Sequence, residues 1–300
     1  MDTNELIEKV RKIEIKTRGL TRQVFAGEYH SAFKGRGIAF SEVREYQYGD
    51  DIRNIDWNVT ARFNHPYIKI FEEERELTVM LLVDVSGSRN FGSNAQLKKN
   101  MITEIAAVLS FSAIQNNDKI GVIFFSDKVE KFIPPKKGRQ HILRVIRELI
   151  EFKPTSNKTN LSEALRYFTN IVKKKSTVFL ISDFMDFPEN SNFIEGTGAL
   201  NYEDALNVAA RKHDMIGLRV FDEREKQLPS IGLLKVKDAE TGEETWIDTS
   251  SKTIRERYTK WQENMENKIK ETFSRNGIDA VAIHTGEDYV KPLIGLFKRR

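Results

Sequence analysis

Residues 77–88 read LTVMLLVDVSGS, an apolar run that ends in an aspartate followed by spaced serines. Every residue from Leu77 to Val83 is uncharged, and Asp84 is the first carboxylate after them. A continuous apolar run of this length is typical of a central parallel strand that is covered on both faces. In sheets built from such strands, ligands bind beyond the carboxyl ends of the strands. Asp84 therefore marks a candidate site.

The rest of the chain alternates between apolar strands and helix-forming segments. We expect helices at residues 95–115, 139–151, 160–173, 202–212 and 250–275, with a short one at the C-terminus. We expect strands at 119–126, 177–184, 215–221 and 278–285, a hairpin arm at 129–134, and a hairpin around Thr241 and Gly242. This order predicts an α/β fold with a doubly wound, mostly parallel, Rossmann-like sheet.

Residues 1–76 have a different character. Helical spacing at 5–18 is followed by a glycine-punctuated stretch that mixes aromatic and charged residues, and this stretch predicts an irregular or strand-containing unit. We therefore expect two domains, an N-terminal unit at 1–76 and an α/β domain at 77–300. Trp57 is expected to pack within the first unit.

Six charged residues of the N-terminal unit admit two interpretations. They are Arg44, Asp50, Asp51, Arg53, Asp56 and Arg62. They form either a recognition surface for a partner or an internal network of ion pairs and hydrogen bonds that locks the irregular unit onto the sheet. We favour the network, because a segment without long regular elements has to satisfy its backbone groups through side chains.

Composition excludes several classes of protein. The chain of 300 residues has no cysteine, which excludes disulfides, thiolate zinc sites, iron–sulfur clusters and a cysteine nucleophile. Its 48 basic and 44 acidic residues are interspersed and give a net charge of +4, which does not indicate a nucleic-acid partner. No apolar run approaches the ~20 residues of a membrane span, and Met1–Glu5 lacks the features of a secretory signal. We expect a cytoplasmic protein.

Oxygen-bearing side chains gather at the predicted strand ends. Asp84, Ser86 and Ser88 follow the spacing D-x-S-x-S, and alternate residues that leave a strand point the same way. Asp183 closes a second apolar strand, and Thr159 precedes the helix expected at 160–173. These hard oxygen donors suit Mg²⁺, or else Mn²⁺ or Ca²⁺, better than Zn²⁺ or Cu²⁺. An incomplete Mg²⁺ cage leaves a coordination position that an acidic side chain of a partner can fill.

At these residues the sequence resembles a von Willebrand factor type A domain with its metal-ion-dependent adhesion site. The resemblance implies that Ser86, Ser88 and Thr159 touch the ion directly, while Asp84 and Asp183 hold it partly through water. Residues 35–74 resemble the signature of the bacterial domain of unknown function fifty-eight family, and this likeness spans nearly the whole chain. It implies a protein partner, a MoxR-type AAA+ ATPase. Arg89 stands where we expect methionine, a departure outside the five ligands.

Two other interpretations remain open. The serines are also compatible with a simple cap on the following helix, with the aspartates on polar loops, and metal titration separates this from a metal site. A phosphatase or phosphotransferase of haloacid-dehalogenase type also has an aspartate after its first core strand, but needs an acid two residues on, where this chain has Ser86. Phosphate-loop, dinucleotide and nucleophile-elbow motifs are missing. We therefore expect a non-enzymatic binding module with no catalytic residues.

Overall fold

The computed structural model describes residues 39–72, 77–90, 98–187, 200–237, 242 and 244–300. The helix expected at 5–18 and most of the loop at 184–200 lie outside these residues. The chain divides into two compact units, of which the smaller is Phe33–Leu77. The described residues of the larger unit run from Thr78 to Arg300.

The smaller unit is built on an antiparallel strand pair with two short helical segments between the strands. Its elements are β1 (Ala39–Glu45), η1 (Ile52–Asn54), α3 (Trp57–Phe63) and β2 (Tyr67–Glu72). Asp56 caps α3 by accepting hydrogen bonds from the backbone N–H groups of Asn58 and Val59. The expectation that Trp57 packs within this unit is wrong. Trp57 is 70% exposed, and no residue of α3 is buried.

Charged side chains of the smaller unit pair with one another. Arg44 makes two hydrogen bonds to Asp50, of 2.9 and 2.7 Å, and Asp50 also accepts the backbone N–H of Gln47. The carboxylate of Asp51 accepts hydrogen bonds from the backbone N–H and from the guanidinium of Arg53. These contacts pair four of the six charged residues within the unit. They are largely exposed, so each adds little to stability. That such a network locks the unit onto the sheet stays a prediction.

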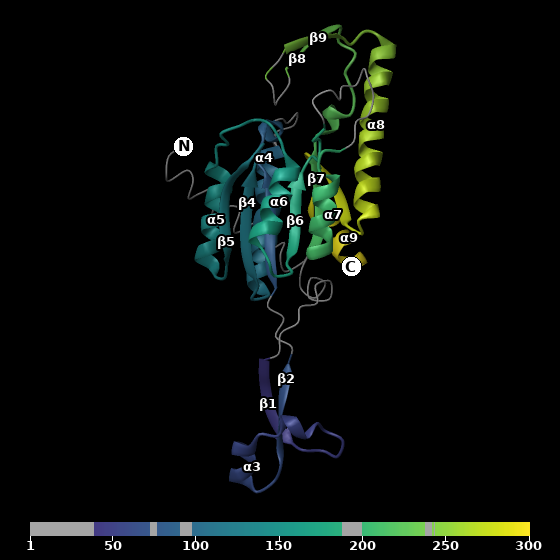
Figure 1. The fold of residues 1–300 in the computed structure, drawn as a ribbon. Coiled ribbons are helices and arrows are strands. Elements are labelled where there is room, and N and C mark those ends of the chain that lie inside the picture. Colours follow the sequence, from purple (N-terminus) through teal and green to yellow (C-terminus); the bar gives the residue numbers. More distant parts are fainter. Residues whose placement is uncertain (1–38, 73–76, 91–97, 188–199, 238–241, 243) are drawn as a thin grey trace. The chain divides into compact units, whose positions relative to one another are not determined.

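The larger unit is a six-stranded sheet with helices on both sides (Figure 1). Its strands are β3 (Thr78–Asp84), β4 (Lys119–Phe125), β5 (Val129–Lys136), β6 (Thr177–Ser182), β7 (Asp214–Phe221) and β10 (Asp279–His284). The spatial order is β10-β7-β6-β3-β4-β5, and every neighbouring pair is parallel except β4 with β5. The predicted fold class, a doubly wound and mostly parallel α/β sheet, is confirmed.

Helices cover the two faces of this sheet. They are α4 (Lys98–Gln115), α5 (Arg139–Glu151), α6 (Leu161–Ile171), α7 (Glu203–Lys212), α8 (Lys252–Arg275) and α9 (Val290–Arg299). Met80 and Leu82 share one core cluster with residues of α6, α7 and α8. Phe124 and Phe179 point to the opposite face, where Phe124 stacks on Phe152 after α5 and Phe179 meets Phe297 of α9. Every residue from Val79 to Val83 is therefore buried, as the apolar run of β3 predicts.

The remaining elements extend the carboxyl side of the sheet. They are η2 (Gly87–Asn90), η3 (Glu223–Glu225), β8 (Leu233–Lys237) and β9 (Glu244–Asp248). Strands β8 and β9 form the expected hairpin. None of the helices in the described ranges combines the length and the hydropathy that a bilayer crossing requires.

One strand is shorter than expected. β6 ends at Ser182, not at residue 184, because the backbone of Phe184 turns into the left-handed region with φ of 63°. A bulky residue rarely adopts this conformation, since it costs about 1 kcal/mol or more. Its buried ring holds it there, in contact with Phe273 of α8 at 4.9 Å between ring centroids. The turn directs Asp183 out of the strand.

Candidate metal centre

Asp84 and Asp183 lie where the strand order of the sheet reverses. β3 pairs with β4 on one side and with β6 on the other. From β3 the chain first moves outward through β4 and β5, and then returns across β3 to form β6. The crevice at such a switch point is the usual ligand site of an open α/β sheet. Asp84 is the last residue of β3, and Asp183 directly follows β6.

Asp84 is held by two hydrogen bonds. Its side chain is buried, with 3% of the residue exposed. Oδ1 accepts the backbone N–H of Ser86 at 2.9 Å, and Oδ2 accepts the hydroxyl of Ser182 at 2.6 Å. Ser86 is fully buried, and its Oγ lies 3.2 Å from Oγ of Ser88. The three residues of the D-x-S-x-S spacing are thus brought together as the sequence predicts.

The loop that carries Thr159 lies against the turn after β3. The backbone N–H of Gly87 donates to the carbonyl of Asn157 at 2.9 Å. Asn160 donates to the carbonyl of Ser126 at 2.8 Å, and its side chain caps α6 by accepting the N–H of Glu163. Thr159 is half-buried within this loop. The loop is therefore fixed to both neighbouring strand ends.

The turn after β6 completes the arrangement. Asp183 accepts the backbone N–H of Met185, and the buried Asp186 accepts the N–H of Leu161 at the start of α6 at 2.7 Å. The turn after β6 is thereby joined to the loop that carries Thr159, while Ser182 joins it to β3. Three loops from separate parts of the sequence meet at one edge of the sheet.

The two carboxylates influence each other electrostatically. Burial and the charge of Asp183 raise the pKa of Asp84 to about 6, against the opposing effect of its hydrogen bonds to Ser182 and Ser86. A buried carboxylate beside a second one favours a bound cation, because the cation offsets both desolvation and repulsion. Carboxylate and hydroxyl oxygens are the ligands that Mg²⁺, Mn²⁺ and Ca²⁺ prefer, so the residues present fit a hard divalent cation.

The switch point offers serine and threonine hydroxyls as well as carboxylates as oxygen donors. Within the described ranges, no group of three or more histidine, cysteine, aspartate or glutamate side chains is arranged to hold a metal.

Two buried cations lie at the site: Arg89, which the sequence singled out as a departure that alters the rim and charge of the site, and Lys98, which was not anticipated. Lys98, the first described residue of α4, is 1% exposed, and its Nζ lies 2.5 Å from Oε1 of Glu225 and 3.4 Å from Oδ2 of Asp183. Arg89 is buried, donates to the carbonyl of Phe152 at 2.6 Å, and is close enough to Asp84 to feel its charge. Neither cation follows from local sequence, because their partners lie 63 to 127 residues away.

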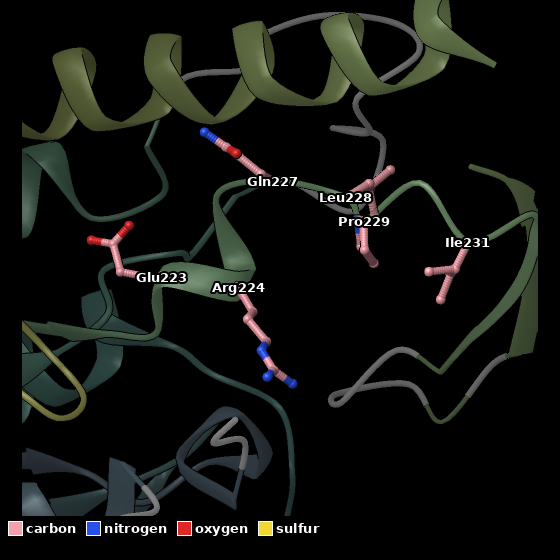
Figure 2. A pocket seen from close by; sticks show the side chains of 6 residues that line it. All are labelled: Glu223, Arg224, Gln227, Leu228, Pro229 and Ile231. Carbon is pink, nitrogen blue, oxygen red and sulfur yellow. The ribbon is translucent and has the colours of Figure 1, made fainter. Parts of the chain in front are cut away.

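A pocket of about 660 Å³ opens beside η3 (Figure 2). It is lined by Glu223, Arg224, Gln227, Leu228, Pro229 and Ile231. Arg224 and Gln227 extend in opposite directions from the turn. Because η3 also carries Glu225, the pocket adjoins the element that contacts Lys98.

Comparison with known proteins places the chain in a family. The family model described as "Protein of unknown function DUF58" matches residues 42–268, well over half of the chain. The chain belongs to the DUF58 family. The matched range contains β3, the three loops and all five predicted ligands of this DUF58 chain. The uncharacterized protein Rv1480 of Mycobacterium tuberculosis is 28% identical to it over 244 residues, which cover 81% of the chain and 73% of the relative.

Solved structures with similar folds include von Willebrand type A domains. The VWA domain of SpRpn10 matches 75% of the DUF58 chain and 95% of its own length, at 10% identity and a TM-score of 0.38. Proximal thread matrix protein 1 from the mussel byssus, with a zinc-occupied MIDAS motif, matches 75% of the chain and 46% of its own length, at 14% identity and a TM-score of 0.39. The zinc belongs to that protein.

Proposed function

We propose that this DUF58 chain is a non-enzymatic binding module that holds a protein partner through one divalent cation. The ligands would be Asp84, Ser86, Ser88, Thr159 and Asp183, and the cation would be Mg²⁺, or else Mn²⁺ or Ca²⁺. Ser86, Ser88 and Thr159 would contact the ion directly, and the two aspartates would hold it partly through water. The ion would supply a positive centre with an open position, which an acidic residue of the partner fills.

One observation carries this proposal: the loops after β3 and β6 and the loop before α6 are hydrogen-bonded to one another at the switch point of the sheet. The contact of 3.2 Å between the hydroxyls of Ser86 and Ser88 supports it, because hydroxyls this close can face one ion. The buried carboxylate of Asp84, whose pKa the charge of Asp183 helps to raise, also supports a bound cation.

Calorimetric titration of Mg²⁺ and Mn²⁺ tests the proposal. We expect one site in the wild-type chain and loss of binding in Ser86→Ala. Ser112→Ala is the matched control, because Ser112 is also fully buried and its hydroxyl has no hydrogen-bond partner among the described residues. Equal affinity of the wild type and Ser86→Ala would refute the site.

The contacts of Asp84 also favour a binding role over the phosphatase alternative. Both of its oxygens accept hydrogen bonds, from Ser86 and Ser182, and position 86 offers a hydroxyl where proton transfer needs an acid. We therefore propose no catalytic residue. We expect no Mg²⁺-dependent hydrolysis of a generic phosphate ester, and turnover that Asp84→Asn abolishes would refute this part.

The partner and location remain part of the proposal. Taking up the family resemblance, we propose a MoxR-type AAA+ ATPase in the cytoplasm as the partner, with an N-terminal unit at 1–76 and a binding domain at 77–300. Binding of the purified ATPase from the same organism should need Mg²⁺ and should be lost on chelation and in Ser86→Ala. If neither chelation nor Ser86→Ala weakens binding of the ATPase, the ATPase does not bind through the proposed metal site.

A further inference from the structure

Lys98 is the most completely buried charged side chain at the candidate metal centre, and nothing in the binding role proposed above uses it. Its ammonium lies between two carboxylates, 2.5 Å from Glu225 and 3.4 Å from Asp183. The side chain is 1% exposed, whereas those of Asp183 and Glu225 are 9% and 28% exposed. A buried charge is retained only when its partners offset the cost of desolvation. The two carboxylates supply that offset.

Glu225 is itself fixed in place, so the ammonium is not free to swing away. Its Oε2 accepts the backbone N–H of Asp222 at 3.1 Å in a capping box that closes η3. Its carbonyl accepts the hydroxyl of Tyr258 on α8 at 2.8 Å. Asp222 is in turn bonded to Thr285 after β10, at 2.5 Å. The position of the Lys98 ammonium is thus set by three elements of the larger unit.

Buried positive charges offset part of the negative charge at the switch point before any ion binds. The carboxylates there are those of Asp84, Asp183, Asp186 and Glu225, and the cations are Arg89 and Lys98. A divalent cation bound there would share the carboxylate of Asp183 with the Lys98 ammonium.

We infer that Lys98 is a built-in competitor of the divalent cation, which lowers the affinity of the site for the free ion and so couples ion binding to the arrival of an acidic partner. This inference rests on the metal-dependent binding role proposed above. The ammonium lies 3.4 Å from Asp183, which the ion would share, and two cations at neighbouring positions repel each other more strongly where water is partly excluded. A partner carboxylate lowers that repulsion, so the ion and the partner are expected to bind together.

The test is a titration of Mn²⁺ and of Mg²⁺ alone into charge variants, read by calorimetry. Lys98→Met removes the competing charge at similar volume, and we expect the dissociation constant to fall about tenfold or more. Lys98→Gln should act in the same direction while keeping donors for both carboxylates, so it serves if the methionine variant does not fold. Glu225→Gln should weaken ion binding, because Lys98 then has Asp183 as its remaining anionic partner among the contacts described above.

Lys131→Met is the matched control. Lys131 pairs with Glu148 at 2.6 Å between β5 and α5, so its removal breaks an ion pair of similar length away from the switch point. We expect no change in ion affinity. Thermal unfolding of every variant checks that the fold is retained.

Each outcome separates this inference from the proposal beneath it. Tighter binding in Lys98→Met that disappears in Lys98→Met combined with Ser86→Ala would support both. If the wild type binds the ion and both Lys98→Met and Lys98→Gln bind it with equal or lower affinity, the role of Lys98 is refuted. The proposed metal site is then retained. No binding of either ion in the wild type and in both Lys98 variants would refute both.

Discussion

The hydroxyl of Ser182 donates a hydrogen bond of 2.6 Å to Oδ2 of Asp84, so the last residue of β6 is bonded to the last residue of β3. The same Oγ accepts the backbone N–H of Phe184 at 3.0 Å. A single side chain therefore orients the buried carboxylate of Asp84 and supports the turn that carries Asp183. In the proposed metal centre, Ser182 would therefore affect both ion binding and the stability of the fold.

Ser182→Ala should lower both stability and ion affinity. It leaves the buried Asp84 carboxylate without one of its two donors, and the loss of a hydrogen bond to a charged group costs about 2 kcal/mol. Asp84 would also lose its fixed orientation toward the ion. Denaturant unfolding and Mn²⁺ titration measure the two effects. If Ser182→Ala resembles Ser112→Ala in both measurements, the bond between the two strands has no such role.

Gly217 of β7 should not tolerate a larger side chain. A Cβ at this position would lie 2.4 Å from Cε1 of Phe273, so the α8 helix packs directly on the bare backbone. We expect Gly217→Ala to destabilise the fold by about 1–3 kcal/mol through overpacking. Phe273 also packs on Phe184, so the strain should reach the turn that carries Asp183.

Gly295→Ala is the matched control for this change. Nothing lies within 4 Å of a Cβ built at Gly295 in α9. There alanine should stabilise the helix by about 0.5–1 kcal/mol. Thermal unfolding compares the two variants, and equal effects would show that the close approach of Phe273 is unimportant.

His213 should make the fold sensitive to acid. It is 3% exposed, and its ring packs on Phe168 with 4.4 Å between ring centroids. Burial, helped by the charge of Lys212, lowers the pKa of His213 from 6.5 to about 4. Between these values the unfolded chain binds a proton that the folded chain does not, so stability falls as the pH drops from about 6.5 toward 4. The loss reaches about 3 kcal/mol.

His213→Phe tests this origin of the acid sensitivity. The variant keeps the packing on Phe168 and removes the titrating group, so the free energy of unfolding should depend less on pH between 4 and 6.5. Urea unfolding at several pH values measures the slope. An unchanged slope in the variant would assign the acid sensitivity to other groups.

Local patterns predicted most of the large unit. The apolar run of β3 is long enough to specify a strand that is buried on both faces, and the helices expected at 139–151 and 250–275 lie within two residues of α5 and α8. The spacing of Asp84, Ser86 and Ser88 also predicted their proximity, because it depends only on the direction of one strand.

What the sequence did not predict depends on contacts between distant segments. Lys98 is followed by a second lysine, Lys99, in α4, and its burial depends on Asp183 and Glu225, whose placement follows from the sheet order. The early end of β6 depends on Phe184, whose left-handed backbone is held by packing against α8. Neither feature has a local pattern from which it can be derived.

The most direct test of the metal centre is a crystal structure of this DUF58 chain grown with excess Mn²⁺, for the wild type and for Lys98→Met. We expect one anomalous peak within coordination distance of the hydroxyls of Ser86, Ser88 and Thr159, with Asp84 and Asp183 around it. A peak confined to other residues, or none near Ser86 in either crystal, would contradict the proposed metal centre.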